Sequence, residues 1–69
     1  MFFFDPYHFR RDAKKLIKYI NDGNVPPPDY LETVRQLAHE TLNDENRGTR
    51  IRLRAQELLR FLRANGLIE

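Results

Sequence analysis

The apolar side chains of this 69-residue sequence recur at the spacing of an α-helix in three separate segments, and this periodicity constrains the fold most. No segment alternates apolar and polar residues at length with the period of two that a half-buried strand shows. An Asn-Asp-Gly-Asn stretch with three prolines separates the first two segments, and a polar loop separates the last two. The sequence therefore predicts an all-α fold of three helices.

The first predicted helix covers residues 6–21. Asp5 and Pro6 are a typical helix start, because an aspartate accepts hydrogen bonds from free backbone N–H groups and proline suits the first helical position. The narrow apolar face consists of Phe9, Ala13, Leu16, Ile17 and Ile20. Gly23 is expected to end the helix, since glycine adopts the left-handed conformation without strain.

The second and third predicted helices cover residues 28–42 and 49–65, and we expect them to form an antiparallel hairpin with the first helix packed across it. The second has a broad apolar face made of Tyr30, Leu31, Val34, Leu37, Ala38, Thr41 and Leu42. The third is lined by Ile51, Ala55, Leu58, Leu59 and Leu62. Thr49 is placed to cap the start of the third helix, and Gly66 is placed to end it.

The length of the chain allows one hydrophobic core, so residues 1–69 are expected to form a single domain, with residues 1–5 as an aromatic arm. Because so small a core supplies only about 3–5 kcal/mol of net stability, we also expect self-association. The absence of Cys suits a reducing compartment. Neither a signal peptide nor a membrane span is recognisable, and the sequence predicts a cytoplasmic or otherwise intracellular protein.

Residue types that carry out catalysis or bind metals are scarce. There is no Ser or Cys nucleophile, and the three glycines are isolated instead of forming a phosphate-binding loop. His8 and His39 lie on different predicted helices, whereas a zinc site needs three or four converging ligands. A chain this short also has little room for a substrate pocket. We therefore expect no enzyme activity, no metal, no cofactor and no small-molecule substrate.

The net charge is only +2, but the positive charges are concentrated. Five basic residues fall within about 140° on the back of the first predicted helix, opposite its apolar face. They are Arg10, Arg11, Lys14, Lys15 and Lys18, and only Asp12 interrupts them. This strip is either a phosphate-binding surface or an ordinary solvated helix face.

A second basic cluster crowds the start of the third predicted helix and consists of Arg47, Arg50, Arg52 and Arg54. The helix dipole disfavours positive charge at this end by about 0.3–1 kcal/mol per residue, so the placement points to a function. Guanidinium groups bind phosphate in a planar, two-point fashion. The alternative is that Asp44 and Glu45 offset the charge through salt bridges.

The third candidate surface is apolar. Phe2, Phe3 and Phe4 precede the first helix, whereas Leu53 and Phe61 project from the third helix outside its core stripe. These side chains are either wrapped inside the three-helix fold or form an interface with another copy or another protein. For the three N-terminal phenylalanines we expect burial, on the hairpin or against a second chain.

Part of the chain resembles known helical families. The resemblance is carried by Leu42-Asn43-Asp44-Glu45-Asn46, by Arg52-Leu53-Arg54-Ala55 and by Leu58-Leu59. These residues look like the turn and second helix of a HEAT-type helical hairpin. The same Arg-x-Arg-Ala-x-x-Leu-Leu pattern is similar to the C-terminal helices of bacteriophage small terminase subunits, which recognise DNA for packaging. The resemblance covers about residues 30–66 and implies a helical hairpin, a viral origin and DNA as the partner.

The leading hypothesis from the sequence is a non-enzymatic, nucleic-acid-associated helical module, oligomeric and of viral origin, that contacts phosphates through the nine basic residues above. One alternative is a small protein-interaction module, a regulator or inhibitor that docks through its aromatic and arginine side chains. Another is a membrane-surface protein whose phenylalanines insert into the membrane while the basic strip lies on anionic lipid.

Overall fold

The structure is a computed structural model that describes all of residues 1–69. A short 3-10 turn, η1 (Pro6–His8), leads directly into α1 (Phe9–Asn21). The other two helices are α2 (Pro28–Asn43) and α3 (Thr49–Ala64). No residue lies in a strand, so the predicted all-α class is confirmed.

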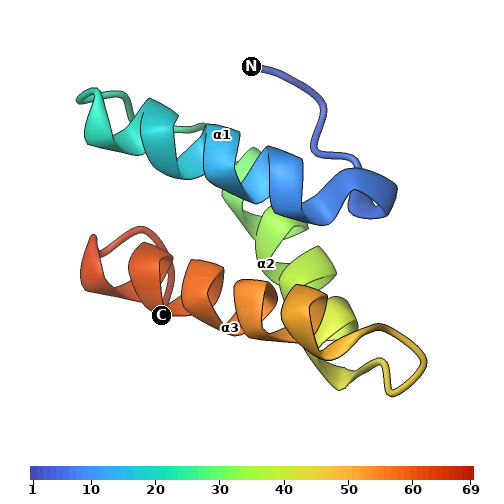
Figure 1. Cartoon of the computed structure of the whole chain (residues 1–69). Coiled ribbons are helices and arrows are strands. Elements are labelled where there is room, and N and C mark those ends of the chain that lie inside the picture. The colour runs from blue at the N-terminus through green and yellow to red at the C-terminus, as the bar shows by residue number, and fades with distance from the viewer.

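The three helices pack as a hairpin with one further helix beside it (Figure 1). α2 and α3 run in opposite directions and form the expected antiparallel hairpin. α1 packs chiefly against α3 and runs in the same direction as α3, so it lies alongside one helix of the hairpin. The N-terminal arm doubles back along α1. It reaches the start of α2, where the rings of Phe2 and Tyr30 meet edge-on with their centroids 6.0 Å apart.

The core contains eleven buried apolar side chains from the arm and all three helices. They are Phe4, Phe9, Ala13, Leu16, Leu31, Val34, Ala38, Ala55, Leu58, Leu59 and Leu62. The ring of Phe4 meets that of Phe9 edge-on, with the centroids 5.2 Å apart. Because burying one phenylalanine contributes about 1.5–3 kcal/mol, the arm is an integral part of this small core.

The start of α3 differs from the expectation. Thr49 is the first helical residue and does not cap the helix; Gly48 holds the N-cap position with an extended backbone and no side-chain hydrogen bond. The first turn is closed by the N–H of Arg52, which donates to the carbonyl oxygen of Gly48 at 3.2 Å. The predicted cap is wrong because a capping residue must keep a non-helical backbone, whereas Thr49 has already turned into the helix.

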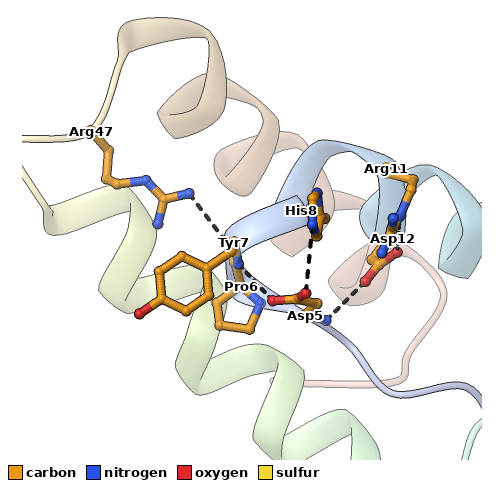
Figure 2. A network of polar contacts seen from close by, with 7 residues as sticks. All are labelled: Asp5, Pro6, Tyr7, His8, Arg11, Asp12 and Arg47. Atoms are coloured by element: carbon orange, nitrogen blue, oxygen red, sulfur yellow. Dashed lines mark hydrogen bonds and ion pairs between the residues drawn. The ribbon is translucent and has the colours of Figure 1, made fainter.

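A buried carboxylate ties the arm to α1 (Figure 2). Asp12 is only 1% exposed. Its carboxylate accepts hydrogen bonds from the Asp5 N–H at 2.8 Å and from Nε of Arg11 at 3.0 Å. Burial by itself raises the pKa of Asp12. These two hydrogen bonds and the positive charges of Arg11 and Lys15 outweigh burial, and the pKa of Asp12 lies below its ordinary value. The carboxylate therefore stays charged while it holds the arm in place.

Candidate functional site

The nine basic side chains expected to contact nucleic acid fall into two groups. Five make hydrogen bonds or ion pairs inside the chain, namely Arg11, Lys18, Arg47, Arg52 and Arg54. The other four, Arg10, Lys14, Lys15 and Arg50, are exposed and make neither. The structure thus separates five basic side chains that already have a partner within the chain from four that have none.

Arg47 and Arg52 have structural roles at the two ends of the loop before α3. Nη2 of Arg47 donates to the carbonyl oxygen of Pro6 at 3.2 Å and connects the loop to η1 (Figure 2). Nε of Arg52 donates to the carbonyl oxygen of Leu42 at 3.0 Å. Leu42 lies in the last turn of α2, where carbonyl groups lack helical partners and attract positive charge. Local structure therefore explains half of the arginine crowding at this helix start.

α1 and α3 bring Arg10 together with Arg50 and Arg54. These three side chains line a shallow depression of about 230 Å³, together with Leu53 and Glu57. They meet because α1 and α3 run side by side in the same direction, which sets the beginning of α1 against the N-terminal half of α3 (Figure 1). We call Arg10, Arg50 and Arg54 the arginine cluster.

The charges around this depression are unbalanced. Its only carboxylate is Glu57, and Oε2 of Glu57 accepts a hydrogen bond from Nη1 of Arg54 at 3.3 Å. Arg10 and Arg50 are exposed and form no ion pair. The side chains that line the depression therefore carry an excess of two positive charges, three arginines against one glutamate, which a bound anion would neutralise.

The lysines at the other end of the basic strip face the N-terminal arm. Nζ of Lys15 lies 4.5 Å from the centroid of the Phe2 ring, within the range of a cation–π contact. Nζ of Lys18 forms an ion pair with Oδ2 of Asp22 at 3.0 Å. The strip is thus divided between two surfaces, with Arg10 beside α3 and the two lysines beside the arm.

The five apolar side chains expected at an interface also differ in their surroundings. Phe4 is buried, Phe2 is half-buried, and Phe3 is 80% exposed. Leu53 is 52% exposed in the depression, whereas Phe61 is half-buried against the core. The N-terminal phenylalanines were expected to be buried either on the hairpin or against a second chain, and Phe4 is buried in the core of this chain. For Phe3 a second chain remains the expectation.

Tyr30 carries a buried polar group, its hydroxyl, which the sequence alone does not single out because Tyr30 lies on the apolar face of α2. Its hydroxyl is buried without a hydrogen-bond partner. Burial, with a smaller contribution from the negative charge of Asp12, raises the pKa of Tyr30 to about 12. The phenol therefore stays neutral at physiological pH and acts as part of the packing beneath the arm.

No three His, Asp or Glu side chains come together as metal ligands. None of the helices combines the length and the apolar character needed to cross a membrane. No protein-family model, curated protein or solved structure matches this chain.

Proposed function

We propose that this chain is a non-enzymatic module that binds the phosphate backbone of a nucleic acid through the arginine cluster. The observation that carries the proposal is the convergence of Arg10, Arg50 and Arg54, from two helices, around one depression with a single carboxylate. Like charges held together in this way reduce stability unless a ligand compensates them. Phosphate is a suitable ligand, because guanidinium groups bind it with paired, charge-assisted hydrogen bonds.

Neighbouring side chains extend this surface and indicate what else it contacts. Lys14 lies one helical turn after Arg10 and is exposed. Phe61 lies seven residues after Arg54, on the same flank of α3, and its half-buried ring could stack on an unpaired base. Leu53 adds apolar contact inside the depression. These three side chains favour contact with the phosphate backbone and with unstacked bases of a nucleic acid. This is the class of partner that the resemblance to small terminase subunits implies.

The number of converging arginines sets the expected dependence on salt. Each phosphate contact releases bound counterions, so three contacts predict a log–log salt slope of about −3 for duplex DNA and about −2 for a single strand. Few contacts also mean weak binding by one copy of the chain, because non-specific nucleic-acid binding reaches only about 10⁻⁴–10⁻⁶ M at physiological salt.

Replacing both Arg10 and Arg50 by Ala is expected to weaken nucleic-acid binding about tenfold, since an exposed ion pair contributes at most about 1 kcal/mol. The magnitude of the salt slope should also fall by about two, one for each lost contact. The chain should still fold, with a free energy of unfolding that is unchanged or slightly higher, because both side chains are exposed and their removal reduces like-charge repulsion. Fluorescence anisotropy with labelled duplex DNA, single-stranded DNA and RNA, over a series of salt concentrations, measures both effects.

The control is a double substitution, Arg60→Ala with Arg63→Ala, which removes the same charge from exposed positions of α3 that do not line the depression. It also removes the hydrogen bond that Nε of Arg63 donates to the carbonyl oxygen of Glu69 at 3.1 Å, so circular dichroism should first establish that this variant is folded. The control variant should leave the salt slope nearly unchanged. Equal losses in the two double variants would show only general charge attraction and would remove the cluster from the binding site. A parent chain that binds none of the three nucleic acids would refute the proposed function.

A further inference from the structure

The N-terminal arm forms an apolar ridge between two hollows. Phe3 is 80% exposed and Met1 is 53% exposed. A hollow of about 510 Å³ lies on the side of α1, and one of about 390 Å³ lies on the side of α2. Met1 lines both hollows, and Phe3 lines the one beside α2. Large apolar side chains exposed beside such hollows are unfavourable in water and mark an interaction surface.

The two sides of this ridge carry opposite unpaired charges. The charged side chains that line the hollow beside α1 are Lys15, Lys18 and Asp22. Lys18 and Asp22 form an ion pair with each other, whereas Lys15 forms none and acts on the Asp12 carboxylate only through its charge. The hollow beside α2 contains one charged side chain, that of Asp29. Its Oδ1 accepts a hydrogen bond from the N–H of Tyr30 at 2.9 Å, but its carboxylate forms no ion pair. The charged side chains that lack an ion pair are therefore basic on one side of the arm and acidic on the other, while the α-ammonium of Met1, which lines both hollows, does not distinguish the two sides.

We propose that a second copy of this chain docks on the arm, related to the first by a two-fold axis that runs along the ridge. Such an axis places the basic side of each copy opposite the acidic side of its partner, so each Lys15 faces Asp29 of the partner subunit. A two-fold axis across the ridge would instead oppose like charges. The charge pattern of the surface thus selects both the partner and the direction of the axis.

The same rotation gives Phe3 a place to be buried. Because Phe3 lies on the α2 side of its own ridge, it faces the α1 side of the partner subunit. The hollow there holds about 510 Å³ and is lined by Phe2, Lys15 and Tyr19, among others. Two aromatic rings and an ammonium group are favourable surroundings for a phenyl ring. The phenylalanine that the chain leaves exposed therefore becomes an anchor in the dimer.

A dimer interface of standard size would cover a small part of the surface of this chain. A stable interface buries about 800 Å² on each partner. That is about one-sixth of the 4743 Å² of accessible surface of the chain. An anionic membrane is a poorer occupant of the same surface, because Asp29 would face the lipid headgroups beside the inserted Phe3.

Replacing Phe3 by Ser is expected to raise the dissociation constant of the dimer about a thousandfold, because the two-fold dimer loses two buried anchors and each loss costs about thirtyfold. Sedimentation equilibrium of the parent chain, without nucleic acid, should give twice the 8.3 kDa monomer mass at high concentration and the monomer mass on dilution. The control is Tyr7→Ser, which removes an aromatic side chain that is 89% exposed and lines neither hollow. Both variants should keep the circular dichroism spectrum of the parent.

A charge exchange tests the direction of the axis. Lys15→Glu and Asp29→Lys should each weaken self-association about tenfold, because each creates two like-charge contacts across the two-fold axis. An equimolar mixture of the two variants should restore parental affinity as a heterodimer.

Three results would overturn this proposal: a parent chain that stays monomeric up to millimolar concentration, a dimer weakened equally by the Phe3 and Tyr7 substitutions, or a mixture that associates no better than its components. A monomer that binds phosphatidylserine vesicles through Phe3 would assign the ridge to membranes instead. Because these experiments contain no nucleic acid, none of their results tests the proposed binding of phosphate by the arginine cluster.

Discussion

Replacing Phe4 by Ala is expected to lower the free energy of unfolding by about 3–4 kcal/mol, close to the whole stability of a domain this small. The ring of Phe4 is buried in the core and packs edge-on against Phe9. Its removal loses apolar burial and an aromatic contact, and it leaves a cavity that the short core cannot fill. At room temperature a large fraction of the variant should be unfolded.

The neighbouring residue provides the control for this experiment. Phe3→Ala removes the same side chain from an exposed position, so thermal unfolding of the dilute monomer should not change. Circular dichroism at low concentration separates this effect from any dimerisation. If Phe4→Ala melted at the temperature of the parent, the arm would not be part of the core, and the surface built on it would lose its support.

Replacing Asp12 by Ala is expected to lower the free energy of unfolding by about 2 kcal/mol, because the partly buried N–H of Asp5 loses its acceptor. The variant also loses the hydrogen bond from Arg11. This loss lowers the free energy of unfolding by a smaller amount, because the arginine is exposed. Asp22→Ala is the matched control, since that carboxylate is exposed and pairs only with Lys18. Urea unfolding of both variants measures the difference.

The stabilisation from Asp12 should depend on pH in a defined direction. The pKa of Asp12 is lower in the folded chain than its ordinary value of 3.8, because its hydrogen bonds and nearby positive charges outweigh burial. A depressed pKa contributes stability that is fully present above pH 3.8 and is lost as pH falls through the folded value. The difference in stability between the parent and Asp12→Ala should therefore narrow below about pH 4.

A second carboxylate, that of Glu32, also makes the stability of the chain fall at acid pH, and its contribution can be separated from that of Asp12 by adding salt. Hydrogen bonds from Arg35 and Gln36 lower the pKa of Glu32 from 4.5 to about 2. Glu32 is exposed, so salt weakens its attraction to Arg35. At high salt the remaining acid sensitivity should follow Asp12. A difference between the parent and Asp12→Ala that stays constant from pH 7 to pH 2 would contradict the charged, hydrogen-bonded state of this side chain.

The helices and most of their buried positions follow from the sequence alone, because both depend on local spacing. Phe9, Ala13 and Leu16 lie on one face of any helix that includes them, and the structure buries all three. Gly23 and Gly66 both have positive φ, as expected of glycines that follow helix ends. The N-cap was predicted at Thr49 instead of Gly48, because moving a helix start by one residue changes little in the local pattern.

The grouping of the functional residues was decided only by tertiary structure. Spacing placed Arg10 and Lys15 on one strip, but Arg10 meets Arg50 beside α3 while Lys15 meets Phe2 beside the arm. Phe3 and Phe4 are adjacent and chemically identical, yet one is exposed and the other buried. Helical periodicity determines which side chains share a face of one helix, but it carries no information on which neighbour covers that face. That choice, and the path of the arm between helices, depends on how all three apolar faces are buried together.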